Sequence, residues 1–291
     1  MAGFFFQTKN MKTVAIQGIE GAFHDIAARK YFQTEGEISI LPCSQFRDVI
    51  SALRKDSNLF GIMAIENTIA GSLLQNHELI RESDLAVVGE EKLRISHSLA
   101  ALPGQTIHGI KEIHSHPIAL MQCGDFLNTL PNVTIIEKDD TASSAANIAK
   151  KQLPGAAAIC SKHAAGLYGL EILAEEIETN KRNFTRFLIL ANRWVADEIL
   201  EDSAPNKSSV VFTLPHTEGS LSKVLTILSF YDVNLTKIQS LPVIGREWEY
   251  LFYVDVTFNN YMRYKQAIDA VLPLTKGFKI LGEYNETNSS C

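Results

Sequence analysis

Apolar stretches of strand length alternate with amphipathic stretches of helix length between residues 14 and 190 of this 291-residue chain. The pattern predicts strands at 14–17, 37–42, 60–65, 85–90, 93–101, 133–137, 156–160 and 187–190. It predicts helices at 21–32, from the N-cap Ser44 onward, at 117–129 and at 141–152. Strands that alternate with helices in this way are typical of α/β folds with a mostly parallel sheet. The segment near 85–101 is where we expect the chain to cross between two lobes.

A different pattern follows a polar segment at 202–207, which we interpret as a linker. The remaining elements are expected at 208–214, 219–230, 235–242, 249–257, 261–272 and 277–282. Their order is strand, helix, strand, strand, helix, strand. This order predicts a ferredoxin-like βαββαβ sandwich as a second domain.

Composition narrows the class of protein. With 46% hydrophobic and 21% charged residues, the chain can bury a sizeable core. A net charge of −6 without a basic block argues against a nucleic-acid partner. No apolar run reaches membrane-spanning length, and the apolar start is too short for a signal peptide. Cys43, Cys123, Cys160 and Cys291 lack metal or redox spacing, so we expect free thiols in a reducing cytoplasm.

Three segments place polar side chains where a strand meets the next element. Thr185 and Arg186 precede the strand that begins at Phe187. Glu66, Asn67 and Thr68 directly follow the strand at 60–65, and Gly71 and Ser72 come shortly after them. Residues 115–122 join a short strand to a helix. Such boundaries commonly face a ligand crevice in α/β sheets.

Together these segments resemble the prephenate dehydratase family. The family carries a strand ending in Glu-Asn-Ser with Gly-Ser-Val after it, a Ser-His-Pro-x-Ala-Leu-x-Gln-Cys run, and Thr-Arg-Phe. The matching residues here are Glu66 to Thr68 with Gly71 to Leu73, Ser115 to Cys123, and Thr185 to Phe187. A glycine segment from Gly18 to Phe23 and a helix start from Thr141 to Ala146 also match. The resemblance covers residues 12–191, in the family's order.

The resemblance implies an enzyme that removes water and carbon dioxide from prephenate to give phenylpyruvate in phenylalanine biosynthesis. It implies a catalytic domain at 11–195 with two lobes, like a periplasmic binding protein, and the site in the cleft between them. It further implies a regulatory ACT domain at 206–284 that binds L-phenylalanine. The reaction requires no cofactor and no metal. A homodimer or homotetramer is expected.

Within this reading, Arg186 is expected to bind a substrate carboxylate, since a guanidinium pairs with a carboxylate through two hydrogen bonds. The alternative for Arg186 is an ion pair with a nearby glutamate. Thr185 is expected to donate a hydrogen bond to the departing hydroxyl as charge develops on it.

Asn67 and Gln122 are expected among the catalytic residues, and the polar residues of the set are neutral donors except Glu66. Asn67, Ser72 and Gln122 suit the carboxylates or the hydroxyl, and Phe187 completes the substrate-binding set. Glu66 is the exception, because a carboxylate would repel the anionic substrate, and a structural role is equally open.

Two further residues stand beside predicted helix starts, where a capping role competes with a ligand contact. Ser115 either caps the helix at 117–129 or reaches the ligand. Thr141 either caps its helix or helps to bind an anion there.

The histidines do not indicate a metal site. His114 and His116 lie two residues apart without a third ligand nearby. His24 departs from the Ser or Thr that the family usually has, and it either touches the substrate or caps its helix.

In the second domain, the resemblance places L-phenylalanine at Gly219, Ser220 and Leu221, with Gln239 and Ser240 nearby. The family often has Glu-Ser-Arg-Pro where this chain has Gln239-Ser240-Leu241-Pro242. The loss of that charge pair leaves phenylalanine feedback open against a purely dimerising role.

Two rival functions remain. An arogenate dehydratase would run the same chemistry on the transaminated substrate, and a non-catalytic small-molecule sensor would use the same fold without turnover. An additional chorismate mutase domain is not expected, because too few residues precede the first predicted strand for a helical domain.

Overall fold

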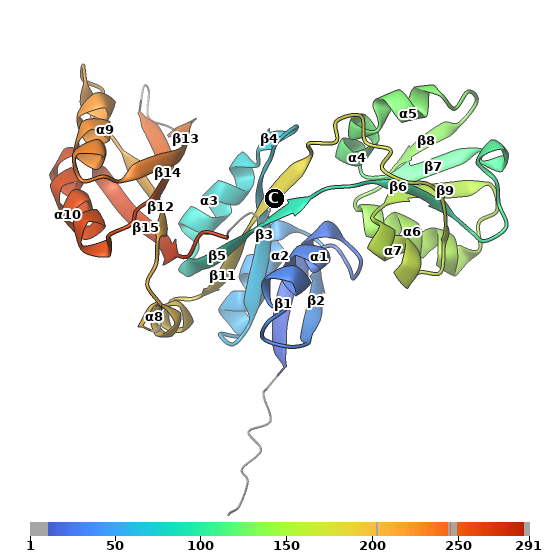
Figure 1. Ribbon diagram of the computed structural model, residues 1–291, viewed down its shortest axis with the longest axis horizontal. Helices are drawn as coiled ribbons and strands as arrows, with labels where there is room; N and C mark the ends of the chain where they lie inside the picture. Colours follow the sequence, from blue (N-terminus) through green and yellow to red (C-terminus); the bar gives the residue numbers. More distant parts are fainter. Residues whose placement is uncertain (1–10, 202, 244, 246–248, 288–291) are drawn as a thin grey trace, which may run out of the picture.

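Three β-sheets organise the part of the chain that this computed structural model describes, residues 11–201, 203–243, 245 and 249–287. Figure 1 shows them in a row, with the first sheet in the middle. The order of the first sheet is β2 (Ile38–Cys43), β1 (Lys12–Gln17), β3 (Phe60–Asn67), β11 (Phe184–Asn192) and β5 (Leu85–Arg94), with β4 (Gly71–Ser72) paired to β3. Its helices are α1 (Phe23–Tyr31), α2 (Phe46–Lys55), α3 (Leu74–Glu82) and α8 (Arg193–Glu201).

The order of the second sheet is β10 (Glu171–Ala174), β6 (Ser98–Ala101), β9 (Ala156–Cys160), β7 (Glu112–Ser115) and β8 (Thr134–Glu137). It is accompanied by η1 (Ile107–Gly109), α4 (Pro117–Gln122), α5 (Gly124–Asn128), α6 (Thr141–Lys151) and α7 (Lys162–Leu167). Small side chains dominate β9, whose five residues are all buried. Helices can therefore pack closely on this sheet.

Both sheets are mixed, whereas the sequence pattern predicted a mostly parallel sheet. Strand β1 pairs with β2 and β3 in parallel, but β11 runs antiparallel to β3 and β5. In the second sheet, β6 runs antiparallel to β9 and β10. The reason is that β6 and β11 enter their sheets from the other sheet and not through a helical crossover, so the handedness rule of βαβ units does not constrain them.

The chain crosses between the two sheets twice. The first crossing segment, residues 95–97, joins β5 to β6, within the region where the sequence predicted a crossing. The second crossing segment, residues 175–183, returns the chain from β10 to β11. Both segments contribute buried polar side chains to the site described below.

Local details differ from the predicted elements. Helix α2 is capped by Gln45 with Asp48 in a capping box, and not by Ser44. The helix expected at 117–129 breaks at Cys123 into α4 and α5. The strand expected at 187–190 begins earlier, at Phe184, so Thr185 and Arg186 lie inside β11. Helices α3, α7 and α8 and strand β10 had not been predicted.

The C-terminal unit, residues 207–287, has the predicted βαββαβ order. Its elements are β12 (Lys207–Thr213), α9 (Ser220–Phe230), β13 (Asn234–Pro242), β14 (Tyr250–Thr257), α10 (Tyr261–Val271), η2 (Leu272–Leu274) and β15 (Lys276–Tyr284). The strand order is β13-β14-β12-β15. Its own core packs between this sheet and the two helices, around Val224, Tyr264 and Ile268.

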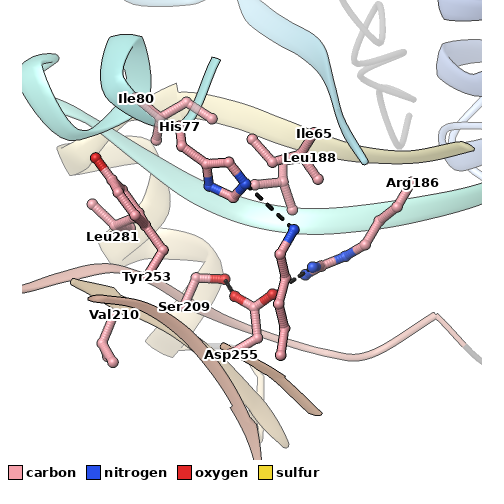
Figure 2. A pocket seen from close by; sticks show the side chains of 11 residues that line it. Ile65, His77, Ile80, Arg186, Leu188, Ser209, Val210, Tyr253, Asp255 and Leu281 are labelled. Carbon is pink, nitrogen blue, oxygen red and sulfur yellow. Dashed lines mark hydrogen bonds and ion pairs between the residues drawn. The ribbon is translucent and has the colours of Figure 1, made fainter. Parts of the chain in front are cut away.

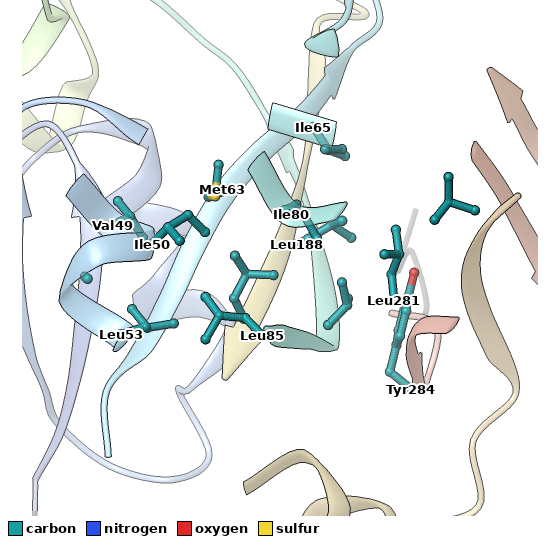
Figure 3. Packing of buried hydrophobic residues seen from close by; sticks show 14 of the residues in the cluster. Val49, Ile50, Leu53, Met63, Ile65, Ile80, Leu85, Leu188, Leu281 and Tyr284 are labelled. Atoms are coloured by element: carbon teal, nitrogen blue, oxygen red, sulfur yellow. The ribbon is translucent and has the colours of Figure 1, made fainter. Parts of the chain in front are cut away.

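The C-terminal unit is packed tightly against the first sheet. Figure 3 shows one apolar cluster that runs from Leu53 and Met63 to Leu281 and Tyr284, and it thus spans both parts. A Cβ atom on Gly282 would collide with the carbonyl oxygen of Val87, so β15 lies directly on β5. This contact permits no side chain at position 282, and it fixes the C-terminal unit relative to the first sheet.

Candidate functional site

A bulge in β3 decides which side chains face the cleft. Strands β3 and β11 pair Thr185 with Asn67 and Arg186 with Glu66, but Phe187 pairs with Ala64, which leaves Ile65 as the extra residue. Because a bulge shifts the alternation of faces by one residue, both Ala64 and Asn67 line the cleft. We call the Thr185–Asn67 pair the cleft rung and the Arg186–Glu66 pair the interface rung.

The cleft encloses about 470 Å³ between elements of the first and second sheets. The first sheet and its helices contribute the starts of α1 and α3 and the cleft rung. The second sheet contributes α4 and the start of α6. The residues that line the cleft include Phe23, His24, Phe46, Asn67, Ser72, His97, Gln122, Asp140, Thr141, Thr185 and Phe187. This volume suits a small organic ligand.

A chain of buried hydrogen bonds holds Thr185. The Asn67 side-chain amide donates from Nδ2 to Thr185 Oγ1 at 3.0 Å and to Asn183 Oδ1 at 2.8 Å. The Asn67 oxygen in turn accepts from the backbone amides of Ile69 and Ala70, which fixes the orientation of its amide group. Since the Thr185 oxygen already accepts a hydrogen bond from Asn67, the Thr185 proton is free to be donated elsewhere.

Gln122 joins this chain to both crossing segments. Its Oε1 accepts from Asn183 Nδ2 at 2.9 Å and pairs with His97 Nε2 at 3.0 Å, and its Nε2 donates to Asn67 Oδ1 at 3.3 Å. An amide oxygen only accepts, so His97 carries its proton on Nε2. Burial lowers the pKa of His97, which keeps the ring neutral. Asn183 and His97 therefore act as buried supports for Gln122 and Asn67.

The cleft holds no fixed cation among its described lining residues. None of them is Lys or Arg, and burial lowers the pKa of His24 to about 4. Helix N-termini are the alternative source of positive potential. Helices α1 and α3 begin at the cleft without a side-chain cap, so the amides of their first turns have no side-chain acceptor.

The start of α6 is different, because Asp140 occupies it. The Asp140 carboxylate accepts from the Ser143 amide at 2.8 Å and is the N-cap of the helix. Burial raises the pKa of Asp140, although the amides of this first turn act in the opposite direction. Thr141 is thus the first residue of the helix and not its cap, and it lines the cleft.

Aromatic rings form the apolar wall. The His24 ring meets Phe187 edge to face at 5.0 Å between centroids and lies 5.4 Å from Phe46. Its Nε2 accepts from the Ala64 backbone amide at 3.3 Å. Phe23 meets His97 edge to face at 5.3 Å. These rings offer a surface for a flat or puckered carbocycle.

The structure brings together six of the residues predicted for the site. Asn67, Ser72, Gln122, Thr141, Thr185 and Phe187 all line the cleft. It does not bring Arg186, Glu66 or Ser115 to the cleft surface.

Arg186 lies on the opposite face of β11 from Thr185. Its Nε donates to Glu90 at 2.7 Å, its Nη2 to the Tyr284 hydroxyl at 3.0 Å, and its Nη1 to Asp255. The expectation that Arg186 binds a substrate carboxylate is therefore corrected to the alternative, an ion pair with a glutamate. Because side chains alternate between the faces of a strand, a cleft position for Thr185 excludes one for Arg186.

Glu66 and Ser115 have structural partners. Glu66 pairs with Lys237 of the C-terminal unit at 2.9 Å. Ser115 is fully buried and donates to the Ile159 carbonyl at 2.7 Å, so it neither reaches the cleft nor caps α4, whose cap is His116. These contacts correct the expectation that either residue binds substrate.

A second, smaller pocket of about 150 Å³ lies in the C-terminal unit. Ser220 and Leu221 line it, together with Leu214, Pro215, His216, Thr217, Tyr250 and Phe252. Gly219, in the left-handed region at φ 74°, starts α9 beside it. Gln239 and Ser240 lie on the edge strand β13 and are not part of the pocket's lining.

His97 and Asn183 had not been predicted as part of the site. His97 was expected inside a strand at 93–101 but lies on the first crossing segment, between β5 and β6, and Asn183 lies on the second crossing segment, for which no strand or helix was predicted. Asn183 lies two residues before Thr185 of the Thr-Arg-Phe run, which is the one local signal that could have indicated it.

Neither a metal site nor a membrane-spanning helix is present in the described residues. No group of three or more His, Cys, Asp or Glu side chains within residues 11–287, outside the gaps noted above, is arranged to hold a metal ion. None of the helices described there combines the length and the apolar character needed to span a bilayer. Cys43, Cys123 and Cys160 are free thiols, and Cys291 lies outside the described residues.

Comparison with known proteins identifies relatives along nearly the whole chain. A family model described as prephenate dehydratase matches residues 14–194. Arogenate dehydratase 2 of Petunia hybrida is 35% identical over 288 residues, which cover 93% of this chain and 71% of that protein. A prephenate dehydratase from Arthrobacter aurescens, solved in complex with L-Phe, superposes with a TM-score of 0.80 at 26% identity and covers 94% of this chain and 89% of that one. A structure described as GqqA, a novel type of quorum quenching acylases, gives a TM-score of 0.81 at 29% identity, with 95% and 99% coverage.

Proposed function

The chain belongs to the prephenate dehydratase family, whose reaction converts prephenate to phenylpyruvate, and we propose that the cleft with Thr185 at its centre is where it occurs. The observation that supports this assignment is the cleft rung. Asn67 donates to the Thr185 oxygen and leaves the Thr185 proton free to point at a ligand. A donor preorganised in this way stabilises an oxygen on which negative charge develops.

The reaction breaks two bonds of prephenate. The ring loses its carboxylate as carbon dioxide, the electrons of that carbon–carbon bond aromatise the ring, and the hydroxyl leaves from the carbon at the opposite end of the ring. The leaving hydroxyl takes up one proton and becomes water. A threonine is too weak an acid to supply that proton outright, so Thr185 donates a hydrogen bond to the leaving oxygen and relays a proton from water.

Backbone amides take the place of Arg186 in binding the carboxylates. The first turns of α1 and α3 are free of side-chain caps and open onto the cleft. Ser72, two residues before α3, and Thr141, the first residue of α6, also line the cleft. We assign the two carboxylates of prephenate to these helix starts, where amide donors attract anions. Phe23, Phe46 and Phe187 then enclose the ring.

The two parts of the chain receive separate roles in this proposal. Residues 11–195 form the catalytic domain, with two lobes like a periplasmic binding protein, and residues 206–284 form an ACT domain. The pocket at Ser220 and Leu221 is the proposed L-phenylalanine site, with Gly219 and the adjacent amides as partners. The L-Phe complex of the Arthrobacter aurescens relative supports an effector role for this amino acid.

We also propose an assembly state and a location for the protein. Phe230 on the outer face of α9 is 74% exposed, which favours burial against a second copy in a homodimer or homotetramer. The buried free thiols Cys123 and Cys160 fit a reducing compartment such as the cytoplasm.

The names of the relatives raise two other activities. Arogenate differs from prephenate by an ammonium in place of the keto group, and the Petunia hybrida relative carries that name. An acylase nucleophile would need a base to take its proton, whereas the described partner of the Thr185 oxygen is the Asn67 amide, a donor. The cleft geometry therefore favours dehydration over acyl transfer.

The test is turnover of prephenate by the purified protein, followed as phenylpyruvate, with arogenate compared in parallel and with L-phenylalanine added or omitted. Thr185→Val keeps the shape of the side chain and removes the donor, so kcat should fall on the order of 10²–10³-fold. Thr185→Ser keeps the hydroxyl and should retain most of the activity. Equal rates for wild type and Thr185→Val would refute the role of Thr185.

A further inference from the structure

Cleft residues and interface residues alternate along the same two strands. The cleft rung, Thr185–Asn67, is one residue away from the interface rung, Arg186–Glu66, on both β11 and β3. Figure 2 shows Arg186 beside Asp255, with Ser209 on the other side of that carboxylate. A displacement of the interface rung therefore moves the cleft rung through a single peptide unit on each strand.

The C-terminal unit holds Arg186 through a buried cluster of charges. We call Arg186, Glu90, Lys207, Asp255 and Tyr284 the interface ion cluster. Glu90 is shared, because it accepts from Arg186 and, at 2.9 Å, from Lys207. Two cations and two carboxylates balance, and Glu90 is fully buried. Pairs of this kind depend on close geometry, because each ion has lost its hydration.

Residues of the C-terminal unit also hydrogen-bond to Asp255 and Tyr284 of this cluster. Ser209 donates to Asp255 at 2.5 Å and lies 2.8 Å from the Tyr284 hydroxyl. Burial by itself would raise the pKa of Asp255, but Arg186 and Ser209 outweigh burial and lower it, so the carboxylate remains charged. Arg186 thus meets an anion and a hydroxyl that other residues already hold in place.

Glu66, on strand β3, is also bound to the C-terminal unit. Lys237 on β13 donates to Glu66 at 2.9 Å and lies 3.3 Å from His77 Nε2, and its side chain is 10% exposed. Both members of the interface rung are therefore bound to the C-terminal unit, one through β13 and the other through β14 and β15.

We propose that Arg186 is a positioning residue, through which Asp255 and Tyr284 of the C-terminal unit set the position of Thr185 in the cleft. The same link gives the second pocket a route to the cleft. Strand β14 carries Tyr250 and Phe252 at that pocket and Asp255 at the interface ion cluster, three residues further along. This inference rests on the proposed function, because it assigns a role around the same Thr185.

A matched pair of tyrosines tests the link. Tyr284→Phe removes one hydroxyl, which pairs with Arg186 and Ser209. Tyr264→Phe removes a hydroxyl that is equally buried in the C-terminal unit and bonds to a serine, Ser208, but has no bond to Arg186. Loss of stability alone should therefore affect both variants alike.

The measurements are kcat and KM for prephenate, the thermal midpoint, and amide hydrogen exchange of the peptide that covers residues 184–188. We expect Tyr284→Phe to lower kcat on the order of tenfold with KM nearly unchanged and to speed exchange in that peptide. Tyr264→Phe should retain wild-type kcat and exchange. Asp255→Asn, which removes the charge and keeps the volume, should lower kcat further.

The outcomes separate this inference from the proposed function. Equal kcat and equal exchange in the two tyrosine variants would overturn the positioning role. If the wild type fails to convert prephenate, the proposed function falls, and hydrogen exchange alone then decides the link. Faster exchange confined to Tyr284→Phe would still support it.

Discussion

The cleft rung and the interface rung are neighbours on the same strands, yet the side chains of the first are neutral and those of the second are charged. Thr185 and Asn67 are neutral, and their hydrogen bonds leave one proton of the pair free for a ligand. Arg186 and Glu66 are charged and paired with residues of the C-terminal unit. The first rung keeps an unused donor, whereas the guanidinium of the second is engaged from three sides.

This difference follows from what each face must do. A cleft for a dianion gains from neutral donors on the strands and from the amides of uncapped helix starts, which attract anions. A domain interface gains from charges only when each has a partner, because an unpaired buried ion is strongly destabilising. One strand can satisfy both demands, because its side chains alternate between two faces.

The largest expected effect comes from breaking the interface rung. Arg186→Met leaves Glu90 and Asp255 buried without their shared cation, so the free energy of unfolding should fall by about 3–5 kcal/mol. Glu66→Gln is the matched change on the other strand. Because the Glu66 side chain is 40% exposed, its ion pair should contribute no more than about 1 kcal/mol. Urea unfolding of both variants measures the two values, and similar losses would contradict the contrast.

The next effect comes from reversing the cleft rung. Asn67→Asp keeps the size and the acceptor for the amides of Ile69 and Ala70, but a carboxylate cannot donate to Thr185. The Thr185 proton then turns toward the new carboxylate, and kcat should fall by about tenfold to a hundredfold.

Asn183→Ser serves as the comparison for that variant. It alters the network one step away and leaves Asn67 donating to Thr185, so its loss of kcat should be smaller. If steady-state turnover shows the two variants to be equal, the network acts through its general integrity and not through the direction of the Thr185 proton.

The pH dependence of stability tests the environment of His24. Burial lowers the pKa of His24 from 6.5 to about 4, so between these values the unfolded chain binds a proton that the folded chain does not. Stability should therefore fall as the pH falls from 6.5 toward 4, by up to about 1.4 kcal/mol per pH unit from this residue.

His24→Gln isolates this contribution. The glutamine side chain can still accept from the Ala64 amide but does not titrate in this range. Denaturant unfolding at pH 7 and at pH 4.5 should show a smaller loss for the variant than for the wild type. His77 titrates in both proteins and cancels in the difference. Identical losses would show that His24 is solvated in the folded state.

Much of the cleft was predictable from local sequence. Asn67, Gln122 and Thr185 stand at ends of strands or helices, where ligands gather, and the order of the motifs indicated the family. Arg186 was placed on the wrong face because β11 was expected to begin at Phe187. With the strand starting at Phe184, the alternation of side chains separates Thr185 from Arg186.

The helices α3, α7 and α8 were missed as well. The polar and apolar residues of α3 are too mixed to stand out and α7 has only six residues, so packing stabilises these two helices more than intrinsic propensity does. Helix α8 is amphipathic but buries none of its residues, and its pattern was overlooked. His97 was expected within a strand and Asn183 within a polar connection, whereas a buried hydrogen-bond network defines the roles of both.

The sequence by itself determined the alternation of strands and helices, the βαββαβ order of the C-terminal unit and the identity of the donor on Thr185. These features depend on local periodicity and on chemistry that each side chain carries wherever it lies. Only the tertiary structure decided that Arg186 meets Asp255 and that Glu66 meets Lys237. These partners are 69 and 171 residues apart in the chain, and the docking of the C-terminal unit on β5 brings them together.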